Sequence, residues 1–139
     1  EYTDTDMCAG DTIFGEHEAL IARVPQLLDS TQLAISEGRV HPMVLAARFH
    51  GFFEYLHPFR DGNGRIGRLF SNFILHKAGH PIVIIRQENN GEYIHALRCI
   101  RTERTDEHLI AFFFRMAIER MQREMEEKKS GTKLMSFLF

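Results

Sequence analysis

Residues 57–68 read His-Pro-Phe-Arg-Asp-Gly-Asn-Gly-Arg-Ile-Gly-Arg, a polar and glycine-rich stretch. It separates two segments whose apolar residues recur at helical spacing. Pro58 ends the first of these segments, because proline cannot continue the hydrogen-bond ladder of a helix and restrains the residue before it. The sequence therefore predicts a loop over 57–68 that is held between two helices, a common place for functional residues.

The segments on both sides of this loop predict a mainly α protein. A helix is expected to open at His41-Pro42 and to end before Pro58, with an apolar stripe of Leu45, Phe49, Phe52 and Leu56. A second helix is expected after the loop, closed by Gly79 and Pro81, with a stripe of Ile66, Leu69, Phe70, Phe73 and Ile74. Further helices are expected at about 25–37, 92–101 and 106–128, and a short buried extended segment at 82–85.

The two ends of the chain carry weaker signals. Residues 1–24 are mixed, with Gly10 and Gly15 as breakers, and suit a short β-hairpin with strands around 12–14 and 19–24. The tail, 129–139, turns apolar after a polar break, and the sequence assigns it no packing partner. A length of 139 residues predicts one domain over 1–139.

Composition and charge narrow the class of protein. The formal net charge of −2 argues against nucleic acid and anionic membranes as partners. The sequence has neither a signal segment nor an apolar run that approaches the roughly 18 residues of a membrane span. Two cysteines, Cys8 and Cys99, are too few for a disulfide framework and carry no thiol motif, so we expect them to be idle in a reducing, cytoplasmic setting. Because the chain begins at Glu1 rather than Met, we expect it to be a piece of a longer one.

The loop itself concentrates groups that bind phosphate. The sequence Gly62-Asn63-Gly64 allows left-handed backbone angles and a close approach to a ligand. A helix begins directly afterwards, and its first amides and positive dipole end form an anion site. Arg65 and Arg68 are three residues apart, on one face of that first turn, and can hold successive phosphates.

Two further residues of the loop supply chemistry. Asp61 offers a carboxylate oxygen, the ligand that Mg²⁺ takes when substrate phosphates complete its shell. His57 is the one residue of this stretch with a pKa suited to accepting a proton near neutral pH. Phe59 suits a loop anchor in the core. Together these residues predict phosphoryl or nucleotidyl transfer.

Each of these features, taken alone, has a simpler or a rival interpretation. A Gly-Asn-Gly turn before a helix is usually only a turn, so the argument rests on the joint occurrence. Residues 62–67 match the dinucleotide fingerprint, but that motif follows a strand in a βαβ unit, and here a helix precedes it. The Gly-Lys-Ser/Thr of a Walker loop is absent, and Arg65 and Ile66 stand where a calcium loop needs an oxygen ligand and glycine.

The stretch 57–68 resembles the signature of the Fic family, His-x-Phe-x-Asp/Glu-Gly-Asn-Gly-Arg-x-x-Arg, at every fixed position. The resemblance extends over about residues 10–125. It implies a Fic-type helical bundle with a short β-hairpin flap at about 10–24 that aligns a target segment. It further implies a protein adenylyltransferase, which moves AMP from ATP to a Ser, Thr or Tyr hydroxyl of a target protein and releases pyrophosphate.

The resemblance also implies a role for each residue of the motif. His57 would be the catalytic base, Phe59 the loop anchor and Asp61 the ligand of Mg²⁺. The nucleotide would be held by Gly62, Asn63, Gly64, Arg65, Arg68 and Tyr93, with Tyr93 lining the adenine pocket. Arg101 stands where relatives often carry Asn, so base selectivity stays open.

Other readings of the family likeness stay open too. The chemistry could be phosphorylation, transfer of another nucleotide or removal of AMP, or the domain could bind nucleotide without turnover. Relatives are often restrained by a helix with Ser/Thr-x-x-x-Glu-Gly/Asn, and here only 12–16 matches its first part. We therefore expect an inhibitory helix or antitoxin-like regulator outside this chain, or no restraint at all.

Overall fold

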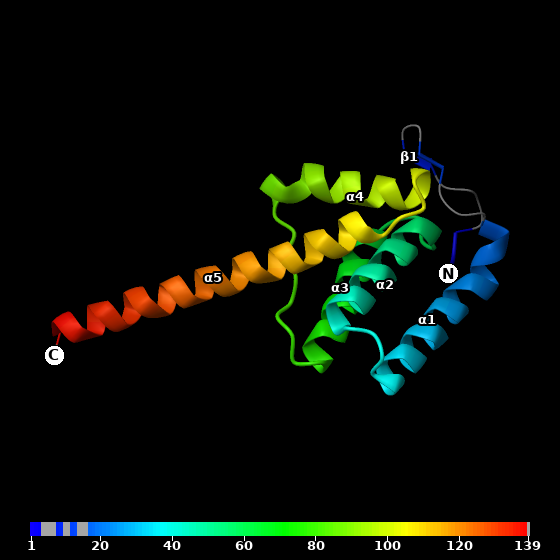
Figure 1. The fold of residues 1–139 in the computed structure, drawn as a ribbon. Coiled ribbons are helices and arrows are strands. Elements are labelled where there is room, and N and C mark those ends of the chain that lie inside the picture. Colours follow the sequence, from blue (N-terminus) through cyan, green and yellow to red (C-terminus); the bar gives the residue numbers. More distant parts are fainter. Residues whose placement is uncertain (4–7, 10–11, 14–16, 139) are drawn as a thin grey trace.

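The structure, a computed structural model, describes the backbone of residues 1–3, 8–9, 12–13 and 17–138. Its helices are α1 (Leu20–Glu37), α2 (Pro42–Leu56), α3 (Asn63–Lys77), α4 (Asn90–Thr102) and α5 (Glu107–Leu138), with 3-10 turns η1 (His17–Ala19) and η2 (Gln87–Asn89) (Figure 1). The prediction of a mainly helical protein is confirmed. No described helix is both long and apolar enough to cross a membrane.

Helix α2 is the centre of the bundle, and α1, α3, α4 and α5 all pack against it. Nine of its fifteen residues are buried. Phe49 and Phe53 stack within it, with ring centroids 5.8 Å apart, and join a core that includes Phe112 and Phe113 of α5. The helix begins as predicted, because the Nδ1 of His41 accepts the Met43 amide at 3.2 Å, next to a proline at the first position.

Helix α3 buries only part of the predicted apolar stripe: Ile74 is buried and Ile66 packs against the core, but the rest of the stripe is exposed. Leu69 and Phe73 are 69% and 55% exposed, whereas the small residues Gly67 and Ser71 are buried against α2. A Cβ atom on Gly67 would lie 2.9 Å from the His50 ring, so only a small residue allows the two helices to approach this closely. The prediction that Leu69 and Phe73 face the core is therefore wrong.

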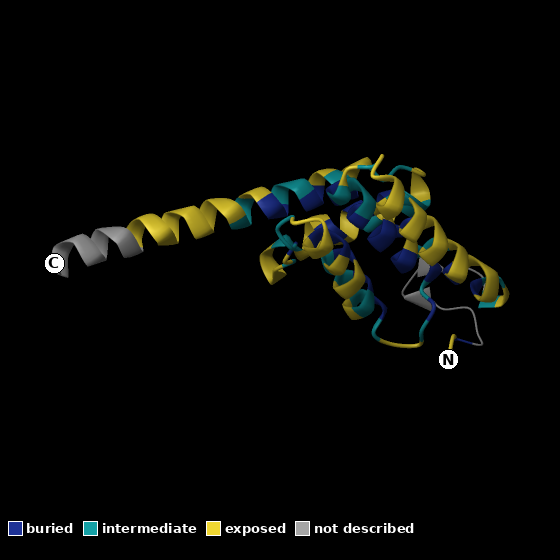
Figure 2. Cartoon of the chain, turned by 90° about the horizontal axis from the view of Figure 1, so that it is seen from below, coloured by how far each residue is buried: buried dark blue, intermediate teal, exposed yellow. Residues whose placement is uncertain are grey.

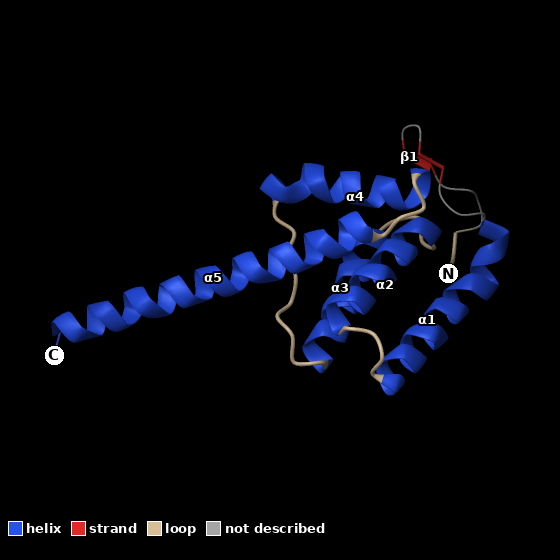
Figure 3. Ribbon diagram, in the orientation of Figure 1, coloured by secondary structure: helices blue, strands red, loops and turns tan. Residues whose placement is uncertain are grey.

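The N-terminal hairpin is also placed differently. Residues 20–24 belong to α1, so the strand predicted at 19–24 is wrong; Leu20 and Val24 lie one turn apart and are both buried. Two short strands instead lie earlier, β1 (Cys8–Ala9) and β2 (Thr12–Ile13), and pair antiparallel (Figure 3). Residues 14–16, which the predicted first strand and the possible restraint motif include, lie outside the described residues.

The C-terminal half of the chain differs from its prediction in two places. Residues 82–85 form no strand: Val83 is buried but Ile84 is 47% exposed. Helix α5 continues through the tail to Leu138, well past the expected end at about 128. Its first turns pack into the core, and Figure 2 shows its second part leaving the bundle, with 121–130 exposed.

Candidate functional site

Residues 57–62 connect α2 to α3, and residues 63–68 already belong to α3, so the loop predicted over 57–68 is shorter than expected. His57 closes α2 with a left-handed backbone, at φ 48°, and its amide donates to the Phe53 carbonyl at 2.9 Å. A left-handed conformation is costly for a residue other than glycine and concentrates at functional sites. It turns the chain out of the helix at the residue that the sequence assigns as the base.

The His57 imidazole is partly buried and lies beside charged groups. Its side chain is 20% exposed, and its Nδ1 lies 3.8 Å from Oε2 of Glu54. Burial lowers the pKa of His57, a hydrogen bond with the Glu54 backbone raises it, and the nearby Arg101 cation lowers it again. The net lowering of its pKa favours the neutral ring, the state in which an imidazole accepts a proton.

The loop is braced from inside by Asn63. This residue is 2% exposed, and its side chain turns back on the loop: Oδ1 accepts the Phe59 amide at 2.9 Å and Nδ2 donates to the Phe59 carbonyl at 2.5 Å. The Phe59 ring packs against Phe53, with centroids 6.3 Å apart. The Asn63 side chain thus holds the shape of the loop and leaves anion binding to the backbone.

The N-terminus of α3 faces this braced loop. Gly62 occupies the cap position with φ 85°, a left-handed angle that favours glycine, and no side chain caps the helix. The Ile66 amide is the first to donate to a carbonyl four residues earlier, that of Gly62, at 2.9 Å. The preceding amides of α3 have no such partner within the helix, the arrangement that binds phosphate.

Three charged residues surround this helix end. Asp61 and Arg65 form an exposed ion pair, with Oδ2 and Nη2 2.9 Å apart. Arg68 is half-buried and lies against the first turn: a Cβ on Gly64 would be 3.1 Å from its Nη1. The absence of a side chain at Gly64 therefore lets this guanidinium lie close to the open amides.

Glu54 is a residue of the site that the sequence analysis did not name, and Arg101 was linked there only to base selectivity. Glu54 is 8% exposed; burial raises the pKa of its carboxyl group, and the cations of Arg68 and Arg101 oppose that rise. Arg101 also donates from Nη2 to the Glu54 carbonyl at 2.7 Å, at the end of α2. The sequence does hold a signal for Glu54: it is an acidic residue within an apolar helix, three positions before His57.

Tyr93 lies beneath the site, in the core. It is 5% exposed, and its hydroxyl lies 2.8 Å from Nε2 of His50. Burial lowers the pKa of His50 to about 4 and raises that of the Tyr93 hydroxyl. This placement supports a role in holding α4 to α2, and the role of Tyr93 in lining an adenine pocket stays a prediction.

Comparison with known proteins assigns the family. A model described as the Fic/DOC family matches residues 1–75, more than half of the chain. The chain belongs to the Fic/DOC family. The whole of α2 and the Fic motif loop lie within the matched residues.

Individual Fic relatives agree with this assignment. A protein adenylyltransferase Fic from Drosophila grimshawi is 38% identical over 84 residues, which are 60% of this chain and 17% of that protein. A Fido domain-containing protein from Dictyostelium discoideum is 32% identical over 105 residues, 70% of this chain and 68% of that protein. The crystal structure of a Fic domain containing signaling protein from Bacteroides thetaiotaomicron superposes with a TM-score of 0.78 at 27% identity, over 86% of this chain and 51% of that one. The chain thus spans a small part of the fly relative and about half of the bacterial protein.

Proposed function

We propose that this chain transfers AMP from ATP to a Ser, Thr or Tyr hydroxyl of a target protein and releases pyrophosphate. One observation carries the proposal: a braced loop and the helix start that follows it bring together the His57 imidazole, uncapped helix amides and two arginines. The relative named protein adenylyltransferase Fic supports the same activity.

The reaction assigns one task to each group. The hydroxyl oxygen of the target attacks the α-phosphorus, its proton passes to His57, and the bond from the α-phosphorus to the bridging oxygen breaks as pyrophosphate leaves. The amides at the start of α3 and the guanidiniums of Arg65 and Arg68 would bind the phosphate oxygens. Catalysis of this kind depends mainly on positioning and on neutralising charge, both of which a rigid loop provides.

Asp61 fits the role of a magnesium ligand. Its carboxylate is 91% exposed beside the phosphate cradle, and Arg65 is its ion-pair partner at 2.9 Å. Mg²⁺ commonly takes only one or two protein carboxylates and completes its shell with water and phosphate oxygens. When bound, the ion would neutralise charge on the phosphates, and Asp61 would hold it.

The target and the regulator are part of the same proposal. The antiparallel pair β1 and β2 would serve as the flap that aligns an extended target segment by strand-like pairing. An inhibitory helix or an antitoxin-like chain would supply the restraint. The proposed location is the cytoplasm, because two cysteines are too few for a disulfide framework.

Paired labelling tests the proposal. The chain is incubated with Mg²⁺, a lysate and ATP that carries its label on either the α- or the γ-phosphate. We expect protein labelling from the α-phosphate alone and its loss in His57→Ala. The matched control is His76→Ala, an exposed histidine of α3 outside the site, which should label as the unaltered chain does.

The other outcomes distinguish the remaining chemistries. Label from the γ-phosphate would make the chain a kinase and overturn AMP transfer. Absence of label, with ATP bound equally by the chain and by His57→Ala, would favour a nucleotide-binding module.

A further inference from the structure

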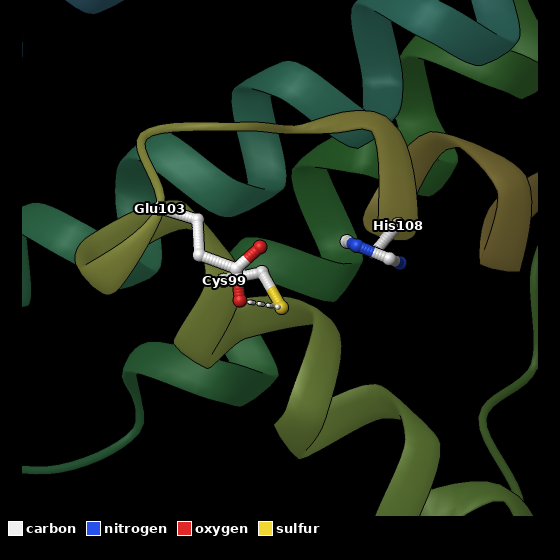
Figure 4. A group of neighbouring side chains, drawn as sticks. All are labelled: Cys99, Glu103 and His108. Carbon is white, nitrogen blue, oxygen red and sulfur yellow. Dashed lines mark hydrogen bonds between the residues drawn. The ribbon is translucent and has the colours of Figure 1, made fainter.

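Three side chains of types that can bind a metal ion lie together where α4 ends and α5 begins, and the proposed transfer reaction uses none of them (Figure 4). Cys99 lies on the last turn of α4, Glu103 caps that helix, and His108 stands in the first turn of α5. One ligand atom from each lies within 4.8 Å of the other two.

The turn between the helices sets this spacing. Arg104 adopts a left-handed backbone, at φ 57°, which few residues other than glycine do. Asp106 pairs with Arg48 of α2, with Oδ2 and Nε 2.6 Å apart, and the Thr105 hydroxyl accepts the Glu107 amide at 3.3 Å. These contacts hold the turn, so the fold itself brings His108 to Cys99 and Glu103.

The distances around the sulfur suit a tetrahedral ion. Zinc with bonds of about 2.3 Å to sulfur and about 2.1 Å to nitrogen or oxygen needs ligand atoms about 3.6 Å apart. The Cys99 thiol donates to Oε1 of Glu103 at 3.5 Å, and Nε2 of His95, one turn earlier on α4, lies 3.7 Å from the same sulfur. The His95 and His108 rings meet edge to face, with centroids 5.6 Å apart.

We propose that Cys99, Glu103 and His108 bind a divalent zinc-class ion. Thiolate and imidazole select zinc over magnesium, which prefers oxygen alone. A metal ion binds cysteine as the thiolate, so it displaces the thiol proton when it binds and its affinity falls as the pH is lowered.

The site ties the end of α4 to the start of α5. Arg101 lies between Cys99 and Glu103 in the chain and donates to the Glu54 carbonyl beneath the motif loop. A metal ion that fixes this end of α4 would therefore also hold the Arg101 side chain in place, and Arg101 supports the end of α2 next to His57. Zinc is expected to raise the unfolding temperature of the chain, since it binds the folded form.

The test is metal binding by the full chain, without ATP. Chain freed of metal by a chelator is titrated with Zn²⁺ against a chromophoric competitor, and with Co²⁺ to detect the thiolate-to-cobalt charge-transfer band. We expect one ion per chain, and a loss of affinity of at least about tenfold in Cys99→Ser, Glu103→Gln and His108→Gln, because removal even of an outer partner costs that much. His76→Gln, an exposed histidine elsewhere, should bind as the unaltered chain does.

Either of two results would overturn the proposal. One is a lack of stoichiometric binding at micromolar Zn²⁺; the other is binding that Glu103→Gln and His108→Gln leave unchanged. Glu103 and His108 are exposed, so their variants remain informative if Cys99→Ser fails to fold.

Discussion

Replacing Asn63 by alanine is expected to destabilise the chain and to stop the proposed AMP transfer. The variant removes two hydrogen bonds and leaves the amide and carbonyl of Phe59 without these partners, next to a position that is 2% exposed. Each bond contributes about 1 kcal/mol, and a buried polar group left without a partner costs about 1–3 kcal/mol. We expect the free energy of unfolding to fall by about 2–4 kcal/mol.

Asn72 offers a matched control for this variant. Its side chain makes the same double contact with another loop, accepting the Val83 amide at 2.8 Å and donating to the Val83 carbonyl at 3.0 Å. Asn72→Ala is therefore expected to lower stability as well, by about 1–3 kcal/mol because the site is less buried, yet to keep AMP transfer per folded molecule.

Urea denaturation followed by circular dichroism gives the two free energies, and transfer is measured in the absence of urea. An Asn63→Ala chain within about 0.5 kcal/mol of the unaltered chain, the range of ordinary surface substitutions, would refute the role of Asn63 as a brace. Equal loss of transfer in both variants would refute the link between the brace and the site.

Three further predictions concern α2 and α3. The pKa of His50 is about 4 in the folded chain against an ordinary 6.5, so on acidification the unfolded chain takes up this proton first. Between pH 7 and pH 4 the free energy of unfolding should fall by up to about 3 kcal/mol more in the unaltered chain than in His50→Gln. Equal pH profiles of the two chains in urea denaturation would contradict this. Gly67→Ala should lower stability by about 1–2 kcal/mol despite the better helix propensity of alanine, because the added Cβ meets the buried His50 ring. Gly91→Ala, with open space around the added Cβ, should not lower it. A stabilised Gly67→Ala chain in the same assay would disprove the close approach of α2 and α3. Arg68→Ala should weaken ATP binding by about 1–3 kcal/mol in calorimetry while the exposed Arg98→Ala does not, and unchanged affinity would remove Arg68 from the phosphate site.

Strong local signals made α2 predictable from sequence. Pro42 and Pro58 fix its ends whatever surrounds them, because proline suits the first turn of a helix and cannot continue one. The order of charged and glycine residues in 57–68 likewise predicted a loop that faces a helix N-terminus, and the structure has that arrangement.

Tertiary packing decided what the sequence could not. Periodicity marks Leu69 and Phe73 as one face of α3, but the approach of α2 selects the face of Gly67 and Ser71 instead. A local sequence pattern also does not predict the burial of a residue whose partners come from distant parts of the chain. Glu54 joins the site only because Arg68 and Arg101, from two other helices, surround its carboxylate.

Mass spectrometry of a labelled target tests the central claim most directly. The chain, Mg²⁺ and ATP are incubated with a lysate, and modified peptides are sequenced from the unaltered chain and from His57→Ala. The account predicts a mass increase of one AMP group on a Ser, Thr or Tyr hydroxyl, absent with His57→Ala. A phosphate adduct, or an AMP adduct that persists in His57→Ala, would contradict it.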